Sequence, residues 1–132
     1  MADASVVVAS LLLERKTPAA LALMAECRNQ DSLLVAPPHQ QLEVAAAITK
    51  RVRRGTIASE YALNLYRIYR EMGLVYESAD LSRAFALSLS WQHSIYDCAY
   101  VALAEQLDCE LYTADEHLWR KIGMATLRIR LI

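Results

Sequence analysis

The sequence predicts an α/β fold in which a parallel sheet of about four to five strands is flanked by helices on both faces, an α/β/α arrangement. Three observations support this prediction. Short apolar runs of strand length alternate with longer segments in which apolar residues recur at helical spacing. The 132 residues match the size of one domain, and no repeat, low-complexity tract or linker divides residues 1–132. The hydrophobic fraction of 55%, with three glycines and three prolines, excludes intrinsic disorder.

The first half of the chain is expected to be mainly helical. An apolar run, residues 4–13, follows the first three residues. Residues 18–28 are predicted as a helix, because the proline at its start suits a first turn. The apolar run 33–36 is too short for a helix and predicts a buried strand. Residues 39–54 show helical spacing, and Gly55 supplies a left-handed residue at the end of that helix.

The second half of the chain alternates helices with short strands, which is typical of a parallel sheet covered by helices. The run 98–104 contains no charged residue, so its helix should be buried on most sides. The predicted helices span residues 59–72, 81–89, 94–107 and 115–122, and the predicted strands span residues 74–76, 110–113 and 126–131.

Composition excludes several classes of protein. The longest uncharged apolar stretch, residues 4–13, is shorter than the roughly 20 residues that span a bilayer, and it lacks a basic leader. We therefore expect a cytoplasmic protein without a membrane partner. Cys27, Cys98 and Cys109 are odd in number and show no C-x-x-C spacing, which argues against disulfides and a thiolate zinc site. The net charge of −1 means that any phosphate binding must come from a local patch.

Four acidic residues stand where open parallel sheets bind their ligands, beyond the carboxyl ends of strands and at the first turns of helices. Asp3 precedes the first apolar run, and Asp115 follows the predicted strand 110–113. Asp97 opens the buried helix, and Glu43 lies in the first turns of the helix at 39–54.

Each of these acids also has a simpler interpretation. Ser94-x-x-Asp97 and Thr113-x-x-Glu116 have the pattern of capping boxes, so Asp97 and Asp115 can simply complement helix N-termini. Glu43 has no Lys or Arg partner at helical spacing, and the alternative there is an exposed, solvated side chain.

The acids belong to four stretches that occur in a fixed order. The stretches are Asp3-Ala-Ser5-Val, Leu42-Glu43-Val44-Ala45 after Pro37-Pro38, Ser94-Ile-Tyr-Asp97-Cys-Ala-Tyr-Val-Ala-Leu-Ala-Glu105, and Tyr112-Thr113-Ala-Asp115. Together they resemble the ordered motifs of the PIN-domain family, and most of all the VapC-type ribonuclease toxins of type II toxin–antitoxin systems. The resemblance covers essentially the whole chain, and the last two stretches in tandem are its most specific part.

The resemblance implies which residues form the site. Asp3, Glu43, Asp97 and Asp115 match the family's four acidic residues, and Ser5 and Thr113 match hydroxyl positions that support the metal shell. It also implies a requirement for Mg²⁺ or Mn²⁺, an RNA substrate, a cognate antitoxin protein and a homodimer. The chain departs from the family in having only Met1 and Ala2 ahead of Asp3, so we expect a truncated first strand.

A cluster of four carboxylates predicts a metal-dependent chemistry. Four carboxylates in one pocket repel one another unless a cation neutralises them, and oxygen-only ligands favour Mg²⁺ or Mn²⁺ over Zn²⁺. We assign Asp3 and Asp97 as metal ligands and Asp115 as a further ligand or part of a second site. Glu43 is assigned to orient or deprotonate the attacking water. The predicted function is a metal-dependent endoribonuclease that hydrolyses RNA phosphodiester bonds.

Two other functions remain open from the sequence. One is a PIN-fold module that binds RNA or protein with little catalysis. The other is a receiver-like or phosphatase-like α/β domain with a phosphorylated aspartate, although Asp3-Ala-Ser5 lacks the second Asp of a D-x-D loop.

Three further groups of side chains each have two interpretations. The basic run either binds RNA phosphates or complements a helix C-terminus; it consists of Lys50, Arg51, Arg53 and Arg54. The stripe at helical spacing is either core or a groove for a partner's amphipathic helix; it consists of Tyr61, Leu65, Tyr66, Tyr69 and Met72. His93 and His117 flank the acidic motifs and are interpreted as surface or packing residues rather than ligands.

Overall fold

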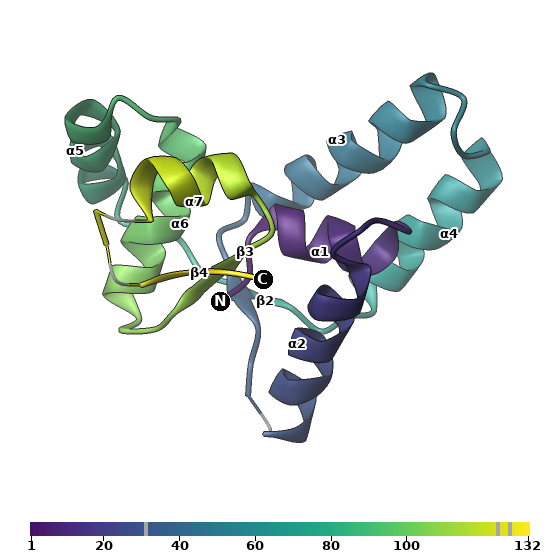
Figure 1. Cartoon of the computed structure of the whole chain (residues 1–132), viewed down its shortest axis with the longest axis horizontal. Helices are drawn as coiled ribbons and strands as arrows, with labels where there is room; N and C mark the ends of the chain where they lie inside the picture. The colour runs from purple at the N-terminus through teal and green to yellow at the C-terminus, as the bar shows by residue number, and fades with distance from the viewer. Residues whose placement is uncertain (31, 124, 127) are drawn as a thin grey trace.

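The structure of the protein is a computed structural model that describes residues 1–30, 32–123, 125–126 and 128–132. In order along the chain, its elements are α1 (Ala4–Leu11), α2 (Thr17–Asn29), β1 (Val35–Ala36), α3 (Gln40–Arg53), α4 (Ser59–Arg70), β2 (Val75–Tyr76), α5 (Leu81–Trp91), α6 (Ile95–Gln106), β3 (Leu111–Thr113), α7 (Glu116–Ile122) and β4 (Ile129–Leu131). Figure 1 shows α5, α6 and α7 at one end, α3 and α4 as a pair at the other, and the strands and both termini between them.

The predicted helices and strands are confirmed in kind, with small changes at their ends. The apolar run 4–13 forms α1 over Ala4–Leu11. Helix α4 begins at Ser59, so its N-cap is Ala58. Gly55 has the left-handed backbone predicted for it, with φ of 68°, and closes the end of α3. The last strand is Ile129–Leu131; Leu127, part of the predicted segment, lies outside the described residues.

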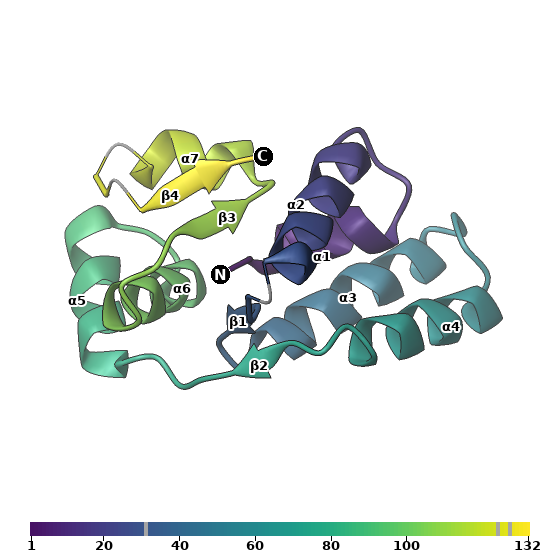
Figure 2. The same ribbon diagram turned by 90° about the horizontal axis from the view of Figure 1, so that it is seen from below.

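The prediction of one sheet with four to five strands is wrong in its continuity. Among the described residues the strands form two separate parallel pairs, β1 with β2 and β3 with β4. Val35 pairs with Val75 in the first, and Leu111 with Ile129 in the second. The residues that would join the pairs are the first three, and they lie between them (Figure 2).

The first residues make backbone hydrogen bonds on the β3 side. The amide of Asp3 donates to Tyr112 O over 3.0 Å, and the amide of Tyr112 donates to Met1 O over 2.9 Å, forming one parallel bridge with β3. On the β1 side a side chain takes the place of a strand, because Gln40 Nε2 donates to Ala2 O over 2.8 Å. The first residues therefore add a single bridge beside β3 rather than a paired strand, and the sheet is interrupted between the two strand pairs.

Apolar side chains form two clusters. One gathers around α6, whose residues from Cys98 to Ala104 are all buried, as the uncharged run predicted. The other gathers residues of α1, α2, α3 and α4. Leu74 and Tyr76 pack against both clusters, so β2 joins the two. Two of the predicted acids lie where these clusters begin, Asp3 at the start of α1 in the second cluster and Asp97 in the first turn of α6 in the first.

Two compositional predictions can be compared with the structure. Cys27, Cys98 and Cys109 are free thiols, and Cys98 is buried in the core. Within the described ranges, no helix is both long and apolar enough to cross a bilayer.

Gln40 provides a test of how the first residues are held. Its side chain is fully buried and supplies the donor for Ala2 O. Gln40→Leu should therefore lower the free energy of unfolding by about 1–3 kcal/mol, because it leaves a buried carbonyl without a donor. Urea denaturation would measure the loss. Gln41→Leu, at the next residue of α3, which is half-buried, is the control, and an equal loss in both variants would contradict this role for Gln40.

Candidate metal centre

Asp3 is the most deeply buried of the predicted site acids. It caps the N-terminus of α1, and its side chain is surrounded by donors. Oδ1 accepts from Ser5 Oγ over 2.6 Å and from the Val6 amide over 3.1 Å, and Oδ2 accepts from Thr113 Oγ1 over 2.6 Å. Ser5 and Thr113, which the family resemblance placed beside the metal shell, thus hold Asp3 from α1 and from the end of β3.

The environment of Asp3 is unfavourable for a negative charge. Burial raises the pKa of Asp3 from 3.8 to about 6, although the hydrogen bonds from Ser5, Thr113 and the backbone lower it. Its partners are hydroxyls and amides, which carry no full positive charge. A carboxylate that is desolvated without a cation costs free energy when it ionises, so a divalent ion at this point would offset that cost.

Asp97 lies in the first turn of α6 and interacts with a second acid. Burial raises the pKa of Asp97, the charge of Asp115 raises it further, and His93 and His39 lower it. His93 Nε2 lies 3.0 Å from Asp97 Oδ2, and the His93 side chain is only 8% exposed. The interpretation of His93 as a packing residue is therefore incomplete, because its ring also orients a site carboxylate.

Asp115 is the N-cap of α7, which confirms the capping interpretation of this acid. Its Oδ1 accepts from the amides of His117 over 2.7 Å and Leu118 over 3.1 Å. The capping box predicted from Thr113 to Glu116 is wrong, because Thr113 belongs to β3 and α7 begins at Glu116. Thr113 Oγ1 instead accepts from the Asp115 amide over 3.0 Å while it donates to Asp3, so one hydroxyl links the two acids.

Glu43 reaches the site through a tyrosine. Tyr100 Oη donates to Glu43 Oε2 over 2.6 Å, and His39 Nε2 lies 3.9 Å from the same oxygen. Burial and the charge of Glu43 raise the pKa of Tyr100, and the charge of Asp3 contributes in the same direction. Tyr100 therefore lies between Glu43 on α3 and Asp3 at the start of α1.

The four acids are linked but are not gathered into a finished ion cage. Thr113 links Asp3 to Asp115, Asp115 acts on Asp97, and Tyr100 lies between Asp3 and Glu43. In the part of the chain that the structure describes, no three His, Cys, Asp or Glu side chains are close enough to hold a metal. The donor chemistry nevertheless fits Mg²⁺ or Mn²⁺, because the linked groups are carboxylates and hydroxyls, which are oxygen ligands. The negative charge of the Asp3 carboxylate is not compensated by a cation among its hydrogen-bond donors.

The basic run lies away from these acids. Lys50, Arg51 and Arg53 are in the last turn of α3, whereas Glu43 is in its first turn. An interval of seven or more helical residues corresponds to roughly 10 Å or more along the axis. Arg51 is already paired with Glu14, while Lys50, Arg53 and Arg54 are exposed.

Tyr100 and His39 are contributors that sequence analysis did not identify. The signal was present in the spacing, because His39 stands four residues before Glu43 and His93 stands four residues before Asp97, an interval that brings side chains together at the start of a helix. Tyr100 stands three residues after Asp97, within a run that otherwise indicated only core packing.

The acids of this α/β fold stand after parallel strands and at the starts of helices. This arrangement is typical of a class of proteins that includes metal-dependent phosphodiesterases. No family model matches the chain. Ribonuclease VapC3 of Pyrobaculum aerophilum is 31% identical to it over 123 residues, which cover 90% of this chain and 91% of the relative. The chain belongs to the VapC family of PIN-domain ribonuclease toxins.

The buried charge of Asp3 predicts a stability that depends on pH. Because the folded-state pKa of about 6 lies above 3.8, the fold favours the protonated acid, and its ionisation destabilises the fold as pH rises through 6. Asp3→Asn should therefore raise the free energy of unfolding near pH 8 in EDTA by about 1–3 kcal/mol, and the gain should vanish below about pH 4. Urea denaturation across this range would measure both.

The control for this prediction is Asp108→Asn, because Asp108 has an 89% exposed side chain and lies outside the site. It should show no comparable gain at high pH. An Asp3→Asn variant that is less stable than the natural chain near neutral pH would contradict the description of Asp3 as a destabilised buried charge.

Proposed function

We propose that the chain is an Mg²⁺- or Mn²⁺-dependent endoribonuclease that hydrolyses RNA phosphodiester bonds in the cytoplasm, as the toxin of a toxin–antitoxin pair. The relationship to Ribonuclease VapC3 over nearly the full length of both chains supports this activity. The observation that carries the proposal is Asp3, a buried carboxylate with a raised pKa; its donor Thr113 Oγ1 also accepts from the backbone amide of Asp115.

In the proposed site, Asp3 and Asp97 hold the divalent ion and Asp115 adds a ligand through the oxygen that does not cap α7. When bound, the ion would polarise the scissile phosphodiester and lower the pKa of the attacking water. Ser5 and Thr113 keep the Asp3 carboxylate in one orientation by donating to its two oxygens. His93 lies just ahead of α6, with its Nε2 3.0 Å from Asp97 Oδ2.

Glu43 is the proposed proton acceptor for the attacking water. Its carboxylate is half-buried and faces the site through its bond from Tyr100. A carboxylate in this position can orient a water and take its proton. Tyr100 fixes the orientation of Glu43, because a buried hydroxyl at 2.6 Å restricts the carboxylate's rotamers.

The two alternative functions have different support. A PIN-fold binding module with little catalysis is favoured by one observation, that both oxygens of Asp3 already have protein donors. A phosphate-accepting receiver or phosphatase domain is disfavoured, because Asp3 is only 5% exposed and cannot meet a phosphoryl donor without rearrangement.

Asp97→Asn separates catalysis from mere binding. The variant keeps the size of the side chain but loses the charge that would hold the metal, so cleavage of RNA in Mg²⁺ or Mn²⁺ should fall by about 10²-fold or more. The measurement is a gel assay of labelled RNA with purified protein, with circular dichroism to check the fold. Asp108→Asn should cleave normally. Full activity in Asp97→Asn would refute the metal site, and no metal-dependent cleavage by the natural chain would favour the binding module.

The antitoxin partner has a candidate groove on the structure. A cavity of about 590 Å³ is lined by residues of α1, α2 and α4 and their flanking loops. Of the aromatic stripe, Leu65 and Tyr69 are buried core, whereas Tyr61 is 52% exposed and lines this groove with Leu21 and Ile68. We propose that an amphipathic helix of the antitoxin places its apolar face here.

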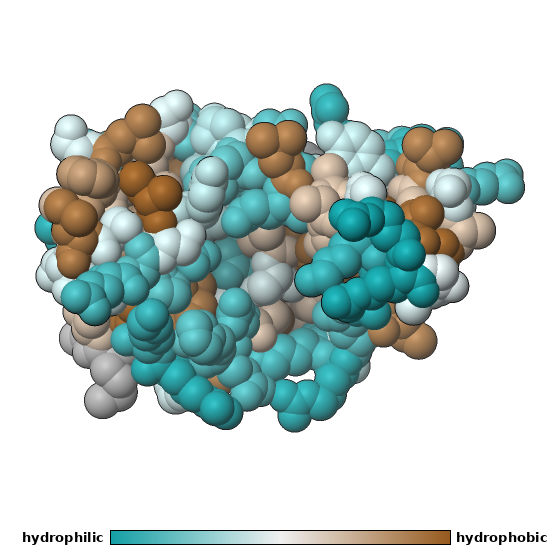
Figure 3. All heavy atoms as spheres, turned by 90° about the horizontal axis from the view of Figure 1, so that it is seen from above, coloured by the Kyte–Doolittle hydropathy of each residue, from teal (hydrophilic) through white to brown (hydrophobic). Residues whose placement is uncertain are grey.

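The proposed homodimer has a candidate surface on α5. Leu81, Phe85 and Leu89 stand four residues apart on one face and are 69%, 56% and 64% exposed. Figure 3 shows hydrophobic side chains gathered at the end of the molecule where α5 lies. Exposed apolar stripes of this kind mark interaction sites in soluble proteins. A two-fold axis across α5 would bury the stripe of each copy against that of the other.

Phe85→Glu tests this surface. A charge buried without a partner in the dimer would be costly, so the variant should elute as a monomer where the natural chain is dimeric. Light scattering after gel filtration would measure both masses. Leu63→Glu, at a 74% exposed leucine of α4, is the matched control and should leave the dimer intact. A Phe85→Glu variant that remains dimeric would exclude α5 as the contact.

A further inference from the structure

A cavity of about 400 Å³ lies beside the candidate metal centre, between the start of α1, the loop from α1 to α2 and the turn from β3 to α7. Ser5 and Asp115 line it, so the cavity is continuous with the site of the proposed reaction. Its volume lies within the range of about 300–1,000 Å³ that ligand sites occupy.

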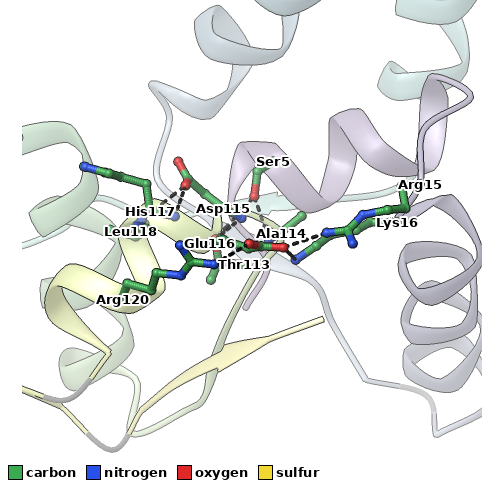
Figure 4. Close-up of polar contacts among 10 residues, drawn as sticks. All are labelled: Ser5, Arg15, Lys16, Thr113, Ala114, Asp115, Glu116, His117, Leu118 and Arg120. Atoms are coloured by element: carbon green, nitrogen blue, oxygen red, sulfur yellow. Dashed lines mark hydrogen bonds and ion pairs between the residues drawn. The ribbon is translucent and has the colours of Figure 1, made fainter.

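Three cations converge on one carboxylate at the edge of this cavity, as Figure 4 shows. Arg15 Nη2 and Lys16 Nζ lie 2.6 Å and 4.0 Å from Glu116 Oε1, and Arg120 Nη2 lies 3.0 Å from Glu116 Oε2. Of the other acids that line the cavity, Glu14 is paired with Arg51 and Asp115 belongs to the candidate metal centre. The cluster therefore has two positive charges more than Glu116 can neutralise.

Lys16 is the member whose charge is least satisfied. Its Nζ is buried and has no hydrogen-bond partner among the residues that the structure describes, and its side chain is 18% exposed. An ammonium group in this state is unstable unless an anion approaches it. Lys16 lines the cavity, so an anion bound there would supply the missing partner.

The bonds to Glu116 are of the kind that a ligand can replace. The Arg15 and Arg120 side chains are 82% and 73% exposed, and exposed ion pairs contribute little and are screened by salt. Arginine forks recognise phosphate with two parallel hydrogen bonds, and lysine adds a compact charge. A phosphate would therefore compete effectively with the Glu116 carboxylate.

We infer that Arg15, Lys16 and Arg120 form a phosphate subsite that binds the RNA strand next to the scissile bond, with Glu116 as a resident anion that RNA displaces. The inference rests on the proposed nuclease function and adds the residues that hold the strand. RNA is favoured over an acidic peptide because the cavity shares Ser5 and Asp115 with the metal centre, which a substrate strand must enter. Arg51 of the basic run at the end of α3 pairs with Glu14, which lines the same cavity.

The test measures binding of a labelled single-stranded RNA of mixed sequence by the full chain, in an Asp97→Asn background that leaves the RNA intact. Arg15→Gln and Lys16→Gln should each weaken binding by about five- to tenfold, and each should reduce the slope of log K against log salt by about 0.7. Glu116→Gln should tighten binding, because it removes the competing anion. Residues that only stabilise the fold would not be expected to weaken RNA binding when Arg15 or Lys16 is replaced and to tighten it when Glu116 is replaced.

Arg83→Gln is the matched control, because Arg83 is an exposed arginine of α5 that is paired with Glu105 and does not line the cavity. It should change neither affinity nor slope. If the natural chain cleaves RNA while Arg15→Gln and Lys16→Gln bind it with unchanged affinity and slope, the subsite is refuted and the nuclease function stands. If Arg15→Gln and Lys16→Gln lose affinity for an oligoglutamate peptide but not for RNA, the RNA subsite is also refuted. A natural chain that neither binds nor cleaves RNA would overturn both proposals.

Discussion

The site depends on one buried charge, the carboxylate of Asp3. Its oxygens accept from α1 and from the end of β3, so one side chain caps a helix, fastens the first residues to the sheet and fixes the turn that carries Asp115. Burial raises the pKa of Asp3 to about 6, which means that the fold is least favourable when this acid is ionised. A residue that destabilises the protein at neutral pH is a typical sign of function, and a divalent cation would offset its cost.

Charge is divided between the interior and the rim of the site. The acids are held by neutral donors and by histidines, whereas Arg15, Lys16 and Arg120 lie outside them around Glu116. A net charge of −1 gives the whole molecule no attraction for RNA, so affinity has to be local. Cations beside an acidic metal centre can hold the substrate without neutralising the ligands that the ion needs.

Most of the fold could be predicted from the sequence because the signals were local. The buried run from Cys98 to Ala104 within α6, the glycine at the end of α3 and the short apolar strands each follow from composition and periodicity. A truncated first strand was expected, but the side chain that takes the place of a strand beside Ala2 could not be predicted, because the bond from Gln40 joins residues 38 positions apart. The four acids were found through family motifs, whereas Tyr100 and the Glu116 cluster depend on contacts between residues distant in the chain, which periodicity does not reveal.

The most direct test of the central claim is anomalous diffraction from crystals soaked in Mn²⁺ at a concentration that supports RNA cleavage. The account predicts an anomalous peak within coordination distance of the Asp3 and Asp97 carboxylates, with Asp115 turned toward it and Ser5 and Thr113 still bound to Asp3. A map without that peak, in which Asp3 and Asp97 keep only protein partners while the ion binds elsewhere, would contradict the account.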